Sequence, residues 1–152
     1  MTESRSRFST DRAANIAAYA QLAAPDPNCC LACASFVEAV DRSLLPSAFV
    51  SLLDTAGVDV RKPLEVWGEP EEGFLQGFYA VCGVLIGPPW SGQAEGAFHE
   101  PVDGFKYYMT EHVTMNDRAF DGMDVFQIEF TWEGEGVVAV GVLGRGRRVT
   151  LR

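Results

Sequence analysis

The stretch Phe74–Ile86, reading FLQGFYAVCGVLI, is the longest apolar run in the chain, and it decides the fold. Gly73 precedes this run, and Gly87-Pro88-Pro89 follows it. Gly77 and Gly83 would each cost a helix about 1 kcal/mol relative to alanine, whereas the aromatic and β-branched residues around them favour a strand. The run is also shorter than the roughly 20 residues that a membrane-spanning helix requires. The sequence therefore predicts a long central strand.

Alternation along this strand gives it two faces that are both mainly apolar, so we expect it to be covered on both sides. Gly77 and Gly83 fall on the same face, where the missing side chains leave two notches. A helix or an aromatic ring could pack there, or a ligand could approach the backbone. We expect packing. The alternative is a small-ligand binder or enzyme with a pocket at Gly77 and Gly83.

Composition indicates one folded domain that spans residues 1–152. Hydrophobic residues make up 47% of the 152 residues, which excludes a disordered chain. The net charge of −9 argues against nucleic acid and anionic membrane as partners and favours a basic protein. Arginines crowd the two ends, and we expect residues 1–8 and 144–152 to be flexible.

The N-terminal sequence MTESRSRFST has no apolar segment of the kind that a signal peptide needs. We therefore expect no export and no membrane span. Four cysteines in such a chain, Cys29, Cys30, Cys33 and Cys82, are expected to be reduced thiols in a bacterial-type cytosol.

The first third of the chain has helical periodicity. Ser9 or Thr10 is the expected cap of a helix that runs to about Ala24, where Pro25-Asp26-Pro27 breaks the chain. Apolar residues at helical spacing predict a second helix from Asn28 to about Leu44. A third helix is expected to begin near Pro46 and to stop at Gly57.

From Val58 onward the period of the apolar residues changes from that of a helix to that of a strand. Besides the central strand, segments with this pattern are 64–67, 105–114, 125–133, 137–143 and 149–151. Helices followed by strands predict an α+β fold, with the N-terminal helices packed on one face of an antiparallel sheet of about five strands. The last two strands belong either to this sheet or to that of a dimer partner.

Two segments resemble a family of small, uncharacterised bacterial cytosolic proteins. The first runs from Cys30-x-x-Cys33 through Leu45-Pro46 to Lys62-Pro63-Leu64-Glu65-Val66, and the second is the glycine–aromatic strand that begins at Gly73. In the family a histidine is expected within that strand, where this chain has Ala80 or Val81. The resemblance covers about residues 29 to 87. It implies a fold and no activity.

The cysteines carry the first candidate chemistry. Cys30-x-x-Cys33 has the spacing of half a zinc site or of a redox pair. The remaining cysteines and histidines form no second pair, and a loop instead of a strand precedes the motif. Buried free cysteine also packs as a small hydrophobe, so we expect Cys33 and Cys82 to be core residues. A thiol- or zinc-dependent protein that uses Cys30 and Cys33, with help from Cys29 or Cys82, is the alternative.

Other candidate catalytic groups lack a supporting pattern. His99 lies in a loop, and His112 lies on an outward strand face without a nucleophile signature beside it. The carboxylates of Glu69, Glu71, Glu72, Glu133 and Glu135 occupy expected turns and are interpreted as solvated. No phosphate-binding or dinucleotide-binding glycine pattern is present. No catalytic residue is assigned, and enzymatic activity is not expected.

Aromatic residues point instead to a binding surface. Trp90 in a Pro-Pro-Trp loop and Tyr108 beside His112 on an outward strand face are rings that the core does not need. With the acidic Glu71 and Glu72, they form the predicted partner-binding set. The sequence therefore favours a non-enzymatic protein-binding module, of inhibitor or immunity type, that contacts another protein. The formation of a homo-oligomer stays open.

Overall fold

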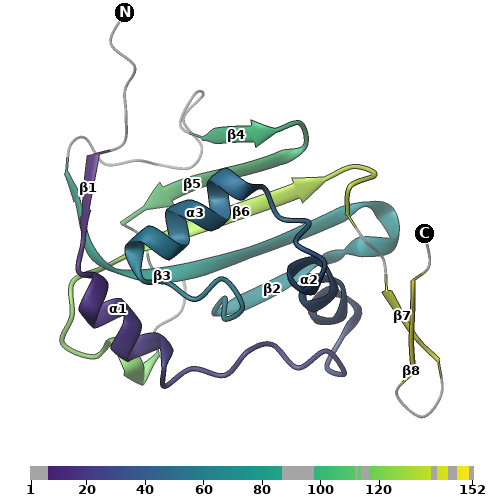
Figure 1. The fold of residues 1–152 in the computed structure, drawn as a ribbon, viewed down its shortest axis with the longest axis horizontal. Helices are drawn as coiled ribbons and strands as arrows, with labels where there is room; N and C mark the ends of the chain where they lie inside the picture. The colour runs from purple at the N-terminus through teal and green to yellow at the C-terminus, as the bar shows by residue number, and fades with distance from the viewer. Residues whose placement is uncertain are drawn as a thin grey trace, which may run out of the picture.

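A computed structural model describes residues 7–86, 98–111, 113, 117–137, 140–143 and 147–150. It confirms the α+β class and the antiparallel sheet (Figure 1). A short strand at residues 7–10 comes first, three α-helices follow up to residue 56, and the remaining strands begin at residue 65. The helices in the described ranges are too short or too polar to cross a lipid bilayer.

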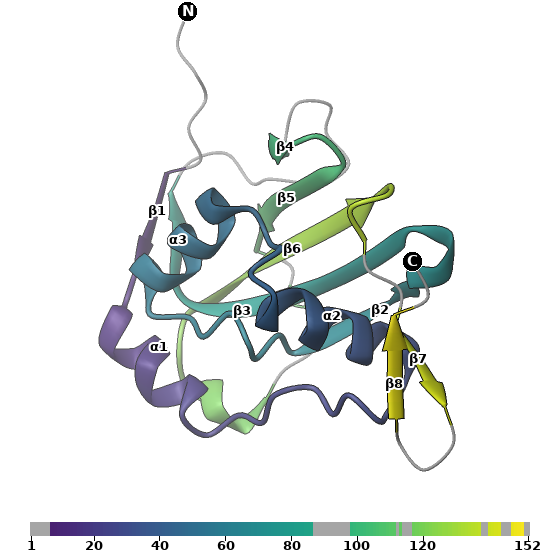
Figure 2. The ribbon, with the colours of Figure 1, turned by 45° about the vertical axis from the view of Figure 1, so that its right-hand side comes forward.

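The main sheet has six strands, one more than expected, in the order β1-β3-β6-β5-β4 with β2 also paired to β3. Figures 1 and 2 show that this sheet is strongly twisted and curved. Its strands are β1 Arg7–Thr10, β2 Glu65–Glu69, β3 Phe74–Ile86, β4 His99–Val102, β5 Phe105–Thr110 and β6 Val125–Glu133.

The last two strands, β7 Val140–Leu143 and β8 Arg147–Thr150, form a separate two-stranded sheet. They pair with each other, and Figure 1 shows this hairpin apart from the main sheet, next to α2. The expectation that these strands join the main sheet is thus wrong for the described residues, and the alternative of pairing with a dimer partner stays a prediction. Residues 147–150 belong to the segment 144–152, whose expected flexibility stays a prediction.

β3 is the central strand, as predicted. β6 pairs along one of its edges from Phe74 to Cys82. The opposite edge is shared by two short strands, because β2 pairs with residues 74–78 and β1 with residues 83–86. Sharing an edge in this way leaves part of the strand, around Ala80 and Cys82, without a strand neighbour on that side.

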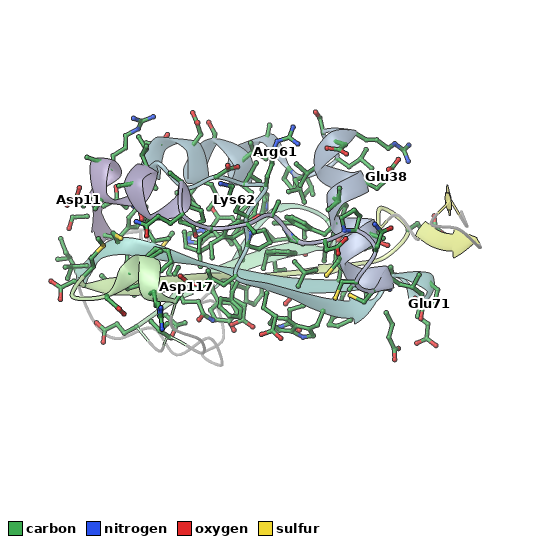
Figure 3. All side chains as sticks on the ribbon, turned by 90° about the horizontal axis from the view of Figure 1, so that it is seen from below. Asp11, Glu38, Arg61, Lys62, Glu71 and Asp117 are labelled. Atoms are coloured by element: carbon green, nitrogen blue, oxygen red, sulfur yellow. The ribbon has the colours of Figure 1, made fainter. Side chains whose placement is uncertain are left out.

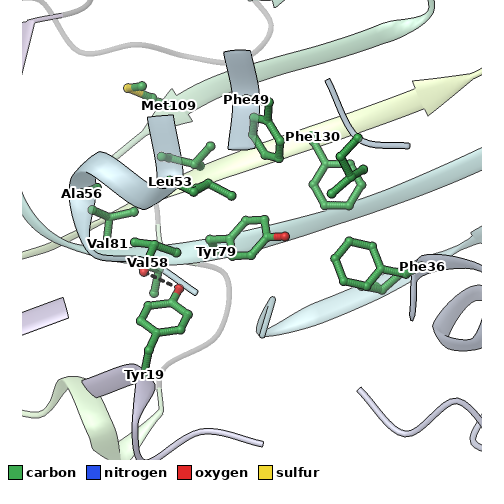
Figure 4. Packing of buried hydrophobic residues seen from close by; sticks show 14 of the residues in the cluster. Tyr19, Phe36, Phe49, Leu53, Ala56, Val58, Tyr79, Val81, Met109 and Phe130 are labelled. Carbon is green, nitrogen blue, oxygen red and sulfur yellow. Dashed lines mark hydrogen bonds between the residues drawn. The ribbon is translucent and has the colours of Figure 1, made fainter. Parts of the chain in front are cut away.

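Side chains of α1 (Arg12–Tyr19) fill this gap between β1 and β2. The Asn15 amide accepts a hydrogen bond from the Cys82 N–H at 2.7 Å and donates one to the Cys82 carbonyl at 3.2 Å, as a neighbouring strand would. Asn15 also donates to the carbonyl of Ala56 at 2.9 Å and is fully buried. The Tyr19 hydroxyl donates to the Ala80 carbonyl at 2.7 Å (dashed in Figure 4). The first helix therefore completes the edge of the sheet.

The starts of the first two helices differ from the prediction. α1 begins at Arg12 after the cap Asp11, whose side chain accepts from the Ala14 N–H, because Ser9 and Thr10 belong to β1. α2 (Leu31–Asp41) is capped by Cys30 instead of Asn28. α3 (Ser47–Ala56) agrees with the prediction and ends at Gly57, which has the left-handed backbone that favours glycine.

The core lies between the helices and the sheet. Phe49 of α3 is fully buried against the rings of Tyr79, Phe105, Tyr107 and Phe130, at centroid distances from 4.9 to 6.1 Å. Phe36 of α2 stacks on Phe130 at 6.0 Å. Figures 3 and 4 show the helices on the side of the sheet to which these rings point. The aromatic contacts thus join helices α2 and α3 to β3, β5 and β6.

Candidate thiol site

The first candidate site lies where the chain enters α2. The turn before it is fixed by Asp26, whose carboxylate accepts from the Asn28 N–H at 2.8 Å and whose carbonyl accepts from the Cys29 N–H at 3.0 Å. Such turns are typical of Asp beside proline. The turn delivers Cys29 and Cys30 to the N-terminus of the helix, and Cys33 follows one turn later on the same side.

Three sulfur atoms converge at this point. The sulfur atoms of Cys30 and Cys33 lie 3.3 Å apart, and the sulfur of Cys30 accepts a hydrogen bond from the Cys33 N–H, also at 3.3 Å. The sulfur of Cys29 joins them, so that all three lie within 4.8 Å of one another. All three are free thiols; Cys29 and Cys30 are exposed, while Cys33 is partly buried. The spacing of the motif predicted the pair, and of the two helpers considered, Cys29 and Cys82, the structure places Cys29 beside it.

The two thiols of the motif have different acidities. Partial desolvation opposes ionisation of Cys30, but hydrogen bonds from Cys33, Ala32 and Cys29 outweigh it and lower the pKa of its thiol. At Cys33, burial and the hydrogen bond to Cys30, with the nearby sulfur charges, raise the pKa to about 12. Cys30 is therefore the thiol that ionises first. Thiolates are the nucleophiles and the metal ligands in cysteine chemistry.

Cys82 takes no part in this site. It is buried on β3 with its sulfur 3.3 Å from that of Met123, and burial together with Asp11 raises the pKa of its thiol. Its assignment to the core is confirmed, whereas Cys33, which is only partly buried, belongs to the cluster.

The packing expected at the glycine notches of β3 is confirmed, and the alternative of a ligand pocket there is wrong. A Cβ atom on Gly77 would lie 2.8 Å from the ring of Phe130 and from the carbonyl oxygen of Glu65. A Cβ on Gly83 would lie 2.1 Å from the carbonyl oxygen of Ser9. Gly77 and Gly83 are glycines because a neighbouring ring and two neighbouring strands occupy the space. The notches therefore cannot hold a ligand.

A hollow of about 860 Å³ lies elsewhere, between α1, the end of α2, α3 and the loop after Gly57. The loop is fastened to two helices: Lys62 donates to the carbonyl of Tyr19 at 2.8 Å, and Arg61 pairs with Asp41 at 3.2 Å (Figure 3). Two of the three cations that line the hollow, Arg61 and Lys62, thus already have partners in the protein, and the hollow carries no assigned ligand.

The structure describes three of the five residues predicted to bind a partner. Trp90 and His112 lie outside the described residues. Glu71 and Glu72 are exposed in a short 3-10 helix, Pro70–Glu72, where Glu72 forms a hydrogen bond with Glu69 that raises the pKa of Glu69. Tyr108 lies on β5 and is partly buried. The protein-binding module, and its inhibitor or immunity role, stay predictions.

Sequence reasoning missed a polar cluster around Glu129 on β6. One carboxylate oxygen accepts from the amide of Gln76 at 2.8 Å, and the other accepts from Gln127 at 3.2 Å. Burial, followed by a hydrogen bond with Glu129, raises the pKa of Tyr108. In the sequence, the only indication of this cluster is the presence of polar residues within strands that are otherwise apolar. Because its donors already satisfy the carboxylate, the cluster is a structural network that links β3, β5 and β6.

Comparison of the chain with protein-family models, with curated proteins and with solved structures finds no match. The resemblance to a family of small bacterial proteins therefore stays a prediction.

Proposed function

We propose that the protein performs dithiol–disulfide exchange, with Cys30 as the attacking thiol and Cys33 as the resolving thiol. The observation that carries this proposal is the 3.3 Å separation of the two sulfur atoms at the start of α2. The outer thiol is exposed and the inner one partly buried, so a partner disulfide reaches Cys30 first. The N–H of Cys33 and the positive end of the helix both favour a sulfur that bears negative charge.

The exchange proceeds in two steps. The Cys30 thiolate attacks one sulfur of a partner disulfide, breaks the S–S bond and forms a mixed disulfide, while the other partner sulfur leaves as a thiolate. Cys33 then gives its proton to solvent or to that thiolate, attacks the Cys30 sulfur and expels the second partner thiolate. Two electrons pass to the partner, whose two thiolates take up the proton released by Cys33 and one from solvent to become a dithiol, and Cys30 and Cys33 become a disulfide.

Exchange chemistry depends on the positions of the two thiols and is not tied to one fold. In this chain a loop, residues 21–30, leads into the helix that carries the motif. The loop leaves Cys30 exposed at the helix end, where a partner disulfide can approach.

Trapping of the intermediate tests the two roles. In a Cys29→Ser background, the further change Cys33→Ser is expected to leave a stable adduct on Cys30 after addition of hydroxyethyl disulfide. The reason is that no second thiol remains to release the adduct. The Cys29→Ser variant that keeps Cys33 should release two equivalents of the reagent thiol and retain no adduct. Intact mass under acid quench measures both outcomes.

The matched variant is Cys30→Ser in the same background, which leaves Cys33 in place. It is expected to react at least about tenfold more slowly, because the remaining thiol is less exposed and less ionised. Cys82→Ala serves as a control that should not alter the rate. Equal rates with Cys30 or Cys33 removed, or an adduct that persists when both thiols are present, would contradict the assigned roles.

A further inference from the structure

We propose that Cys29, Cys30 and Cys33 together bind one Zn²⁺ ion as three thiolates and leave the fourth coordination position open. This site goes beyond the exchange reaction because it assigns a role to Cys29, which the exchange does not use. It shares two thiols with that reaction but does not depend on it. The observation is the convergence of three sulfur atoms within 4.8 Å.

The distances suit a zinc ion. Zn–S bonds of about 2.3 Å in a tetrahedral arrangement place the ligand sulfurs about 3.8 Å apart. The sulfur atoms of Cys30 and Cys33 lie 3.3 Å apart, and no pair in the cluster exceeds 4.8 Å. Cys29 and Cys30 are exposed, so rotation of their side chains can supply the remaining adjustment without moving the core.

The donor set selects the class of metal. The described residues that form this cluster are all cysteines, and thiolates favour Zn²⁺ and other thiophilic ions over Mg²⁺ and Ca²⁺. Three thiolates and one Zn²⁺ carry a net charge of −1. The N–H of Cys33, directed at the Cys30 sulfur, and the start of α2 partly offset it. Because the outer two ligands are exposed, water or an external ligand can reach the fourth position.

Zinc binding and disulfide formation exclude each other at this site. When a disulfide reagent takes two electrons from Cys30 and Cys33, their sulfurs form a bond with each other and no longer serve as thiolate ligands. Oxidation therefore releases the ion, and bound zinc slows exchange. The cluster would in this way combine a metal site with a redox site, each of which can be tested without the other.

Native mass spectrometry of the full chain, purified under reducing and chelator-free conditions and mixed with Zn²⁺, tests the site. The expected result is one Zn²⁺ per chain. Titration with Co²⁺ should give sulfur-to-cobalt charge-transfer absorption that Zn²⁺ abolishes. Cys29→Ser is expected to weaken zinc binding about 100-fold, because the loss of one thiolate ligand removes a corresponding part of the binding free energy of the ion. Cys82→Ala is expected to leave zinc binding unchanged.

The Cys29→Ser variant separates the two proposals because it retains Cys30 and Cys33. Reaction with hydroxyethyl disulfide that persists while zinc affinity falls supports both sites. A wild-type chain that stays free of metal in excess Zn²⁺ overturns the zinc site and leaves exchange standing. Equal losses of affinity in Cys29→Ser and Cys82→Ala would also overturn it. Circular dichroism of each variant shows whether the fold is retained.

Discussion

Replacement of Asn15 by leucine is expected to lower the free energy of unfolding by about 3–4 kcal/mol. Leucine has the same number and branching of side-chain heavy atoms as asparagine and a better helix propensity, so we attribute most of the loss to hydrogen bonds. The N–H of Cys82 and the carbonyl of Ala56 would lose the buried Asn15 amide that binds them at 2.7 and 2.9 Å. The carbonyl of Cys82 would keep its hydrogen bond from the Asp11 N–H. Urea denaturation followed by tryptophan fluorescence measures the change.

The control is Ala17→Leu, which adds the same side chain on the exposed side of the same helix. It is expected to change stability by less than about 0.5 kcal/mol. If Asn15→Leu were as stable as Ala17→Leu, the hydrogen bonds of Asn15 in the gap between β1 and β2 would not contribute to the stability of the fold. The structural account of that edge of β3 would then be incorrect.

Replacement of Phe49 by alanine is expected to lower the free energy of unfolding by about 3–5 kcal/mol, which is the range for removal of a buried ring. Phe49 is fully buried and contacts four aromatic rings on β3, β5 and β6, the nearest being that of Phe105 at 4.9 Å. The cavity would lie between α3 and the sheet, where the surrounding rings are held by strand pairing and cannot collapse. Thermal and urea unfolding of the variant measure the loss.

Ser51→Ala is the matched control for Phe49→Ala, because Ser51 is exposed on the same helix. It is expected to leave stability unchanged or slightly raised, since alanine is the better helix former. A cost below about 1 kcal/mol for Phe49→Ala would mean that α3 does not pack on the sheet through this ring. Retained far-UV circular dichroism would show that the variant still folds.

Local pattern was sufficient to predict much of the fold. β3 and β6 were predicted from apolar alternation, and Gly57 as the end of α3 from its place after the last helical residue. β1 was missed because Arg7–Thr10 is a strand only through its pairing with residues 83–86, which lie far away in the sequence. The same holds for Asn15, whose role depends on a gap between two strands that no local pattern reveals.

The candidate site could be predicted in part. The spacing of Cys30 and Cys33 indicated a thiol pair, since residues three apart on a helix share one side. The contribution of Cys29 depends on the turn that Asp26 fixes, and on Cys30 taking the place expected of Asn28 as the helix cap. At Gly77 and Gly83 the sequence predicted packing but left a ligand pocket open as the alternative, and the structure confirms the packing. A glycine in a sequence marks missing side-chain volume but does not show which neighbour fills it.

The most direct test of the central claim is a redox titration of the wild-type chain, with cysteine alkylation under acid quench and peptide mapping. Buffers of reduced and oxidised glutathione, and of reduced and oxidised dithiothreitol for the lowest potentials, set the potential, and a chelator keeps the thiols free of metal. The account predicts that Cys30 and Cys33 lose their alkylation together in one two-electron transition, while Cys29 and Cys82 remain thiols. The result that would contradict it is alkylation of both Cys30 and Cys33 at every potential, or a disulfide that joins either of them to another chain instead.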